Sequence, residues 1–151
     1  MKGFGMTTEQ LSLAISAIGV LLSGVFSYII TRFASNRTRE EWLKAQVDKY
    51  IEFSITYPYL DSDAYAAKWR RGDSTEEAER YQNFCCFAFN LMERIWEVCE
   101  GNAVKIETYL YYSEIIHRHR NWWVTDPHNQ LGYDPGFIQF IQSILQGKLR
   151  E

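Results

Sequence analysis

The chain has 151 residues, 46% of them hydrophobic and 16% aromatic, and a formal net charge of −3 at pH 7. Of its 16 Lys and Arg and 19 Asp and Glu residues, only Lys2, Arg32 and Glu9 precede residue 34, so residues 34–151 hold 14 basic and 18 acidic side chains. This acidic balance argues against a nucleic-acid partner, because a dedicated nucleic-acid-binding protein needs a basic face. The same residues suffice for one domain with one core.

After a short N-terminal tail over residues 1–10, an apolar segment covers residues 11–33, LSLAISAIGVLLSGVFSYIITRF, with no charge before Arg32. Some 21–23 helical residues extend about 32–34 Å, enough to span a bilayer core of about 30 Å. The segment therefore predicts a transmembrane helix. A buried core helix seldom runs this long without a charge, and a cleaved signal peptide has a shorter apolar core and small residues at its cut.

Charges beside the segment predict its orientation. Lys and Arg near the end of a span favour the cytoplasmic side. The basic residues that follow the segment closely are Arg32, Arg37, Arg39 and Lys44. We expect a single-pass protein of the cell inner membrane, with the N-terminus outside and a cytosolic helical domain over residues 34–151.

Small residues follow one side of the predicted span. They recur at spacings of four, three, four and four, and they are Ser12, Ser16, Gly19, Ser23 and Ser27. Between helices in lipid, small residues allow close approach of the backbones and interhelical hydrogen bonds. The stripe predicts a self-associating helix, and in a sharper form a ring whose serines line a narrow wet pore. The alternative is a lone anchor whose serines bond back to their own backbone.

Helical patterns account for the rest of the chain, and no run alternates as a strand would. We expect helices over residues 37–57, 61–71, 74–100, 102–123 and 135–147. The third, opened by a capping box at Ser74-Thr75-Glu76-Glu77, is expected to be the central helix, and Trp42 is expected to pack. The predicted fold is all-α, with one N-terminal transmembrane helix followed by a cytosolic bundle of four or five helices.

No motif predicts catalysis, and we expect a non-enzymatic protein without cofactor or metal. Glu114 and His117 have the spacing used by di-metal carboxylate proteins, but those proteins need it twice together with two further glutamates. Cys85 and Cys86 are adjacent, which fits neither a redox pair nor a zinc site, so buried thiols are expected. The sequence contains no phosphate-binding glycine loop and no nucleophile elbow.

Basic and aromatic residues gather between His117 and Trp123. The candidate contact residues in this run are Arg118, Arg120, Trp122 and Trp123. Such a cluster can lie at a membrane surface or on a partner, with Trp at headgroup level and Arg facing anionic lipid. Stacking on a nucleotide is a second reading. The third is a helix end whose cations complement the dipole while the tryptophans pack inward.

The layout resembles small bacterial single-pass membrane proteins with a cytosolic Trp-rich helical domain. The resemblance rests on Arg120-Asn121-Trp122-Trp123, a short loop, and Tyr133-Asp134-Pro135-Gly136-Phe137. The plan is also similar to that of the membrane accessory protein of RNA-targeting CRISPR systems, which implies an oligomeric antiviral pore. The HEPN-type motif of that family, Arg and His with four to six residues between them, is absent, since Arg120 and His128 are separated by seven.

Two functions follow as expectations. The first is a membrane protein that self-assembles through its Ser/Gly stripe and acts as a pore-forming or membrane-perturbing effector. The second is an accessory subunit that docks onto a larger membrane complex through its span and aromatic surface. An enzyme or ligand-gated domain is the remaining class, and it would retain a bound metal or ligand through purification.

Overall fold

The structure is a computed structural model that describes residues 8–147; within its first helix, the side chains of residues 8–20, 22 and 36 are outside the description. All regular elements of the described chain are helical, which confirms the all-α fold. The chain divides into two units, Met1–Glu41 and Trp42–Glu151, and each is described separately. The domain boundaries expected near residues 10 and 33 stay predictions.

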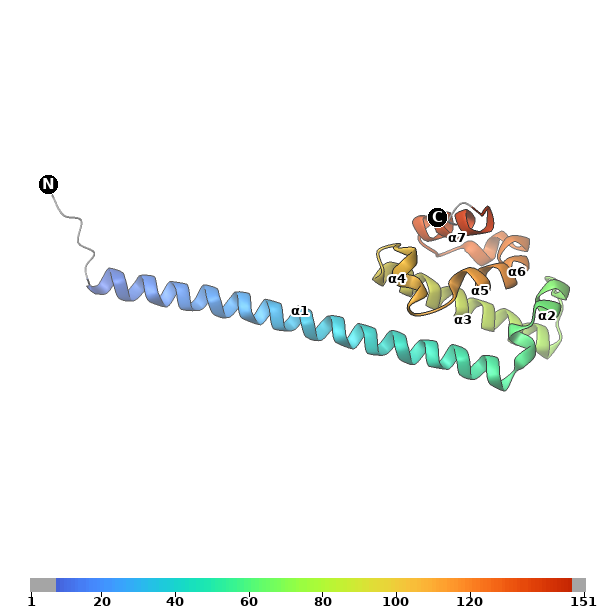
Figure 1. The fold of residues 1–151 in the computed structure, drawn as a ribbon, viewed down its shortest axis with the longest axis horizontal. Coiled ribbons are helices and arrows are strands. Elements are labelled where there is room, and N and C mark those ends of the chain that lie inside the picture. Colours follow the sequence, from blue (N-terminus) through green and yellow to red (C-terminus); the bar gives the residue numbers. More distant parts are fainter. Residues whose placement is uncertain (1–7, 148–151) are drawn as a thin grey trace. The chain divides into compact units, whose positions relative to one another are not determined.

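Helix α1 covers Thr8–Thr56 and contributes to both units (Figure 1). It ends one residue before the expected end at residue 57, because Pro58 follows and the residue before a proline disfavours helical geometry. Among the residues whose side chains the structure describes, no helix contains an apolar stretch that would reach across a membrane. The side chains of residues 11–20 and 22, which belong to the expected span, are not described.

Helix α3, Glu76–Val98, is the central helix of the second unit, and α4 to α7 gather on one side of it (Figure 1). Its N-cap is Thr75, whose side chain accepts a hydrogen bond from the Ala78 N–H. This confirms the expected start, although Thr75 rather than Ser74 caps it and the reciprocal glutamate of a capping box is therefore not in place. On α1, Tyr50 stacks on Phe84 at 5.2 Å between ring centroids, so α3 is covered from that direction as well.

Short helices make up much of the second unit, so the expected count of four or five is too low. Before α3 lie a 3-10 turn, Pro58–Asp61, and α2, Asp63–Lys68. After α3 come α4, Ala103–Glu107; α5, Tyr112–Arg118; α6, Arg120–Thr125; a second 3-10 turn, Pro127–Gln130; and α7, Pro135–Leu145. With the end of α1, the described part of this unit contains seven α-helical segments.

The single helix expected over residues 102–123 is wrong, because three helices occupy this stretch. The reason lies in the angular positions that the buried residues would have around the axis of a single helix. At about 100° per residue, Ile106 and Leu110 would face one side of a straight helix, whereas Ile116 and Trp122 would face away from it. All four are buried, so the chain must turn after α4 to place them in one core.

Trp42 also differs from expectation. Its side chain is 48% exposed, whereas its neighbour Leu43 is 1% exposed and faces the core. Leu43 and Tyr50 are seven positions apart, or about two helical turns, and they define the buried face of this part of α1. Trp42 lies at the edge of that face.

Helix α7 begins as expected at Pro135, with Asp134 as its N-cap, since the Asp134 carboxylate accepts from the Gly136 N–H at 2.7 Å. Gly136 is required by close approach: a Cβ there would lie 3.0 Å from Trp96 Cη2 and 3.0 Å from Asp134 Oδ1. Trp96, on α3, is thereby held against the start of α7.

We expect Gly136→Ala to lower the free energy of unfolding by about 1–2 kcal/mol. Alanine is the better helix former by about 1 kcal/mol in a helix interior, but this gain is small at the second residue of α7, whereas overpacking against an indole costs about 1–3 kcal/mol. Chemical unfolding of the full chain in detergent, followed by circular dichroism, measures this. Because Cη2 belongs to the six-membered ring of the indole, adding Trp96→Phe should recover part of the loss. A Gly136→Ala protein as stable as wild type would show that the contact does not constrain α7.

Candidate functional site

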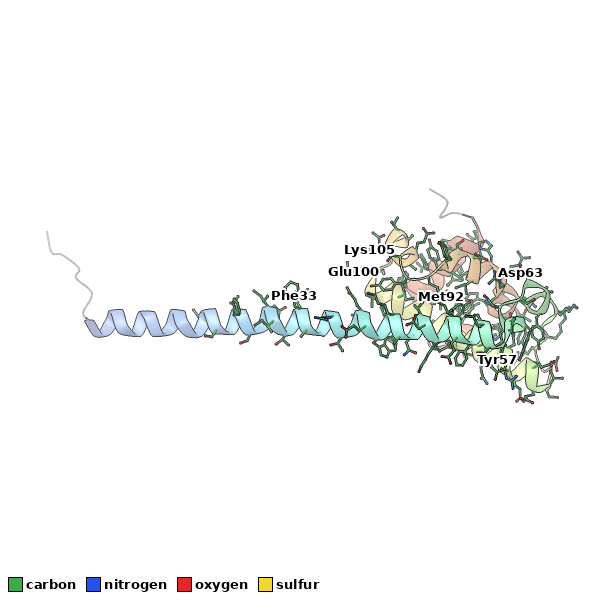
Figure 2. The ribbon with its side chains drawn as sticks, turned by 60° about the horizontal axis from the view of Figure 1, so that its bottom comes forward. Phe33, Tyr57, Asp63, Met92, Glu100 and Lys105 are labelled. Atoms are coloured by element: carbon green, nitrogen blue, oxygen red, sulfur yellow. The ribbon has the colours of Figure 1, made fainter. Side chains whose placement is uncertain are left out.

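Large apolar side chains cover the described part of the predicted span. Phe33 is 74% exposed and Leu21 is 69% exposed. The other exposed large apolar residues here are Val25, Phe26, Tyr28, Ile29 and Ile30. Figure 2 shows side chains projecting from both sides of the helix ahead of Phe33. Contiguous exposed apolar surface of this kind marks a membrane or protein interaction site.

The small-residue stripe is only partly described. Ser12, Ser16 and Gly19 lie outside the described side chains. Ser23 and Ser27 are exposed, and at about 100° per residue they occupy a side of the helix that most of the large apolar residues leave open. Gly24 lies at the edge of this side, and a Cβ there would meet nothing within 4 Å.

Backbone bonding of the kind left open as an alternative is present nearby. The Thr31 hydroxyl donates to the Ser27 carbonyl at 2.8 Å, and the Thr38 hydroxyl donates to the Ala34 carbonyl at 3.0 Å. Such bonds satisfy a hydroxyl within its own helix. These bonds use the Thr31 and Thr38 hydroxyls within the helix, but they leave the space beside Gly24 open.

Trp122 and Trp123, expected at a lipid or partner contact, are in the core. Each is 1% exposed, and the Trp123 ring stacks on Phe89 with centroids 4.6 Å apart. Side chains buried to this extent present no surface to a membrane or partner. Of the readings left open, inward packing describes both tryptophans.

Arg118 is the centre of an ionic cluster rather than an open cation. Its guanidinium donates to Asp61 at 2.6 Å, to Asp63 at 3.1 Å and to Glu114. The Arg118 side chain is 16% exposed. Burial alone would lower the pKa of Arg118, but the hydrogen bonds to Asp61 and Asp63 raise it overall. Arg118 therefore joins α5 to Asp61, at the end of the first 3-10 turn, and to Asp63, the first residue of α2.

Arg120, in contrast, is exposed and lines an open groove of about 1020 Å³ beside this cluster. The groove also contains Arg118, but three carboxylates face the two arginines: Asp63, Glu107 and Glu114. Because acidic groups outnumber arginines, this surface does not favour an anionic lipid headgroup. No group of three or more His, Cys, Asp or Glu residues in the described chain could hold a metal ion.

A buried polar set lies behind Arg118, centred on His119, which is 0% exposed in the break between α5 and α6. The Tyr81 hydroxyl lies 2.9 Å from His119 Nδ1. On the other side of the imidazole, Nε2 faces Asp61 Oδ1 at 3.5 Å. Asp61 Oδ1 also accepts from the Tyr50 hydroxyl at 3.1 Å, so this set connects α1, α3 and the α5–α6 break.

Burial determines the protonation of the groups around His119. It raises the pKa of the Tyr81 phenol and that of the Cys85 thiol, whose Sγ lies 3.8 Å from His119 Nδ1. Both groups therefore hold their protons at neutral pH. Tyr81 can then donate to Nδ1, which leaves the imidazole proton on Nε2, toward Asp61.

The sequence alone does not reveal this set. Its members Asp61, Tyr81 and His119 lie 20 and 38 residues apart along the chain. The one available signal was a histidine amid buried positions, flanked by Ile115, Ile116, Trp122 and Trp123. That signal alone does not reveal its partners, because they come from other elements.

Comparison with known proteins adds no family to this geometry. No protein-family model matches the chain, no curated protein matches it, and no solved structure matches it.

Proposed function

We propose that this protein is a non-enzymatic, single-pass membrane protein that self-assembles through its N-terminal helix. The observation that carries the proposal is the exposed apolar surface from Leu21 to Phe33. Removing a large apolar side chain from water is worth about 1.5–3 kcal/mol, so lipid is a far better surrounding than water for this stretch. Residues 11–20 extend it without a single charge.

Flanking charges support the orientation of the proposed span. The basic residues after it favour the cytoplasmic side, which places the helical second unit in the cytosol and the N-terminus outside the inner membrane. The proposed contact between copies is the Ser/Gly side of the helix. Small residues there would let neighbouring backbones approach.

The mass of the full chain in detergent, measured by light scattering, tests self-assembly. We expect a discrete oligomer for wild type, and we expect the variant Ser16→Leu/Gly19→Leu/Ser23→Leu to lose it, because leucine holds the backbones apart. The matched control is Ile18→Leu/Val25→Leu/Ile29→Leu, whose positions lie on the opposite side of the helix at about 100° per residue. Ion flux through vesicles then tests whether the assembly forms a pore. A wild-type monomer would contradict self-assembly.

A second candidate function is an accessory subunit of a larger membrane complex. It is favoured by apolar side chains that the second unit leaves exposed on α1: Trp42 at 48%, Ile51 at 47%, Phe53 at 41% and Ile55 at 73%. Trp is enriched at the centres of protein interfaces. A monomer in detergent that joins a defined complex in native membranes, and loses it on Trp42→Ala/Ile55→Ala, would support this function.

A further inference from the structure

Tyr81 combines three features that suit a phenol for reversible one-electron oxidation. It is fully buried, its hydroxyl lies 2.9 Å from the imidazole of His119 with the Cys85 thiol as a second neighbour, and its ring lies at the inner end of a series of aromatic side chains. Removing an electron from a phenol makes it very acidic, so oxidation at moderate potential requires a base already in place for the proton. His119 Nδ1, 2.9 Å from the hydroxyl, is such a base.

His119 is positioned to hold the transferred proton. After transfer the imidazole carries a positive charge, and its Nε2 faces the Asp61 carboxylate at 3.5 Å. An opposite charge at this distance stabilises a buried cation. Asp61 also accepts a hydrogen bond from Arg118, and the same guanidinium donates to Asp63 and Glu114, so three carboxylates share one guanidinium. Asp61 is therefore the carboxylate that faces the imidazolium formed by the transfer.

A series of tyrosine rings leads from Tyr81 toward the surface. Tyr81 and Tyr65 have ring centroids 5.3 Å apart, Tyr65 and Tyr59 are 5.1 Å apart, and Tyr59 and Tyr57 are 6.4 Å apart. The three outer rings are only half-buried. Aromatic rings in near contact pass electrons readily, so an oxidant at the surface has a route to the buried phenol.

We infer that Tyr81, His119 and Asp61 form a proton-coupled redox site for one-electron oxidants. The electron leaves Tyr81 through Tyr65 and Tyr59 to an oxidant at the surface, the phenolic O–H bond breaks, and the proton forms a new N–H bond at His119 Nδ1. A neutral tyrosyl radical and an imidazolium result. A one-electron reductant reverses the step, and the proton returns from Nδ1 to the phenolate oxygen. This activity is independent of the proposed membrane assembly.

The test uses the full chain in detergent with a photo-excited ruthenium tris-bipyridine complex and persulfate as the one-electron oxidant. Transient absorption and electron paramagnetic resonance follow the tyrosyl radical. We expect a long-lived radical that Tyr81→Phe abolishes and Tyr111→Phe leaves unchanged, since Tyr111 is 78% exposed. His119→Asn should slow radical formation about a hundredfold, the low end of what a positioned base contributes.

Tyr81→Phe keeps the ring in the core, and circular dichroism verifies its fold. If His119→Asn fails to fold, the solvent deuterium isotope effect on wild type replaces it: transfer to Nδ1 predicts slower radical formation in deuterated water. Radical yield and lifetime that are the same in Tyr81→Phe and wild type would overturn the inference. So would radical formation at Tyr81 that is insensitive to deuterium.

Discussion

Replacing Trp123 by alanine is expected to lower the free energy of unfolding by about 3–5 kcal/mol, the largest loss we anticipate from a single residue. Its ring is 1% exposed and stacks on Phe89, with an interplanar angle of 18°. It also meets Phe137 of α7 edge-on at 6.2 Å between ring centroids. Its removal would leave a cavity where α3, α6 and α7 meet, and domains of this size have only about 5–15 kcal/mol in total.

Chemical unfolding of the full chain in detergent, followed by circular dichroism, measures the effect. Trp42→Ala is the matched control, because its ring is 48% exposed, and its loss should stay within about 0.5 kcal/mol. Trp123→Phe should fall between the two. Among the described residues, the Trp123 Nε1 has no hydrogen-bond partner, so phenylalanine gives up packing volume alone. Equal midpoints for Trp123→Ala and Trp42→Ala would contradict the assigned core.

Local signals in the sequence predicted much of the fold. The run Ser74-Thr75-Glu76-Glu77 predicted the start of α3 to within two residues, and Pro135 predicted the start of α7, because capping depends on side chains within three positions of the helix start. Pro58 gives the end of α1 in the same way. The regular apolar stripe of α3 identified the central helix, since one continuous face is buried along its length.

The breaks between α4, α5 and α6 depend on distant contacts and were missed. Residues 102–123 contain enough apolar side chains to suggest one helix, but Leu110 and Ile116 face the same core only after the chain turns. His119 lies at the second break, where it meets Tyr81 and Asp61. A pattern in one segment cannot show what another segment brings to it.

The candidate contact residues show the same difference between local signals and distant contacts. Arg118 was expected at a lipid or partner contact because it is one of several basic residues next to tryptophans. Its carboxylate partners Asp61 and Asp63 lie more than 50 residues earlier in the chain. Charge in a short run of sequence therefore suggested an outward-facing cation, whereas the folded chain neutralises it. Arg120, two residues on, keeps the exposure that was expected for both.

Replacing Arg118 by methionine is expected to cost about 2–3 kcal/mol at neutral pH. Breaking a fully buried ion pair costs about 3–5 kcal/mol, and the partial exposure of Arg118 at 16% and Asp61 at 25% reduces this. Methionine keeps most of the apolar stem, so the loss reports the charge. The control is Arg94→Met, whose side chain is 58% exposed and whose ion pair with Glu97 should contribute less than about 1 kcal/mol.

Acid should reduce the difference between Arg118→Met and wild type, and the sign follows from Asp61. Burial of this carboxyl opposes ionisation, but contacts from His119, Arg118 and Tyr50 outweigh it and lower the pKa of Asp61. A lowered pKa stabilises the fold above the ordinary value of about 3.9, and the contribution is lost as pH falls through the pKa of the folded state. Unfolding at a series of pH values should therefore show the two proteins converging below about pH 4. A constant difference down to the acid transition would mean that Arg118 stabilises the fold through packing. The charge of the Asp61 carboxylate, which lies beside His119, would then not contribute to that stabilisation.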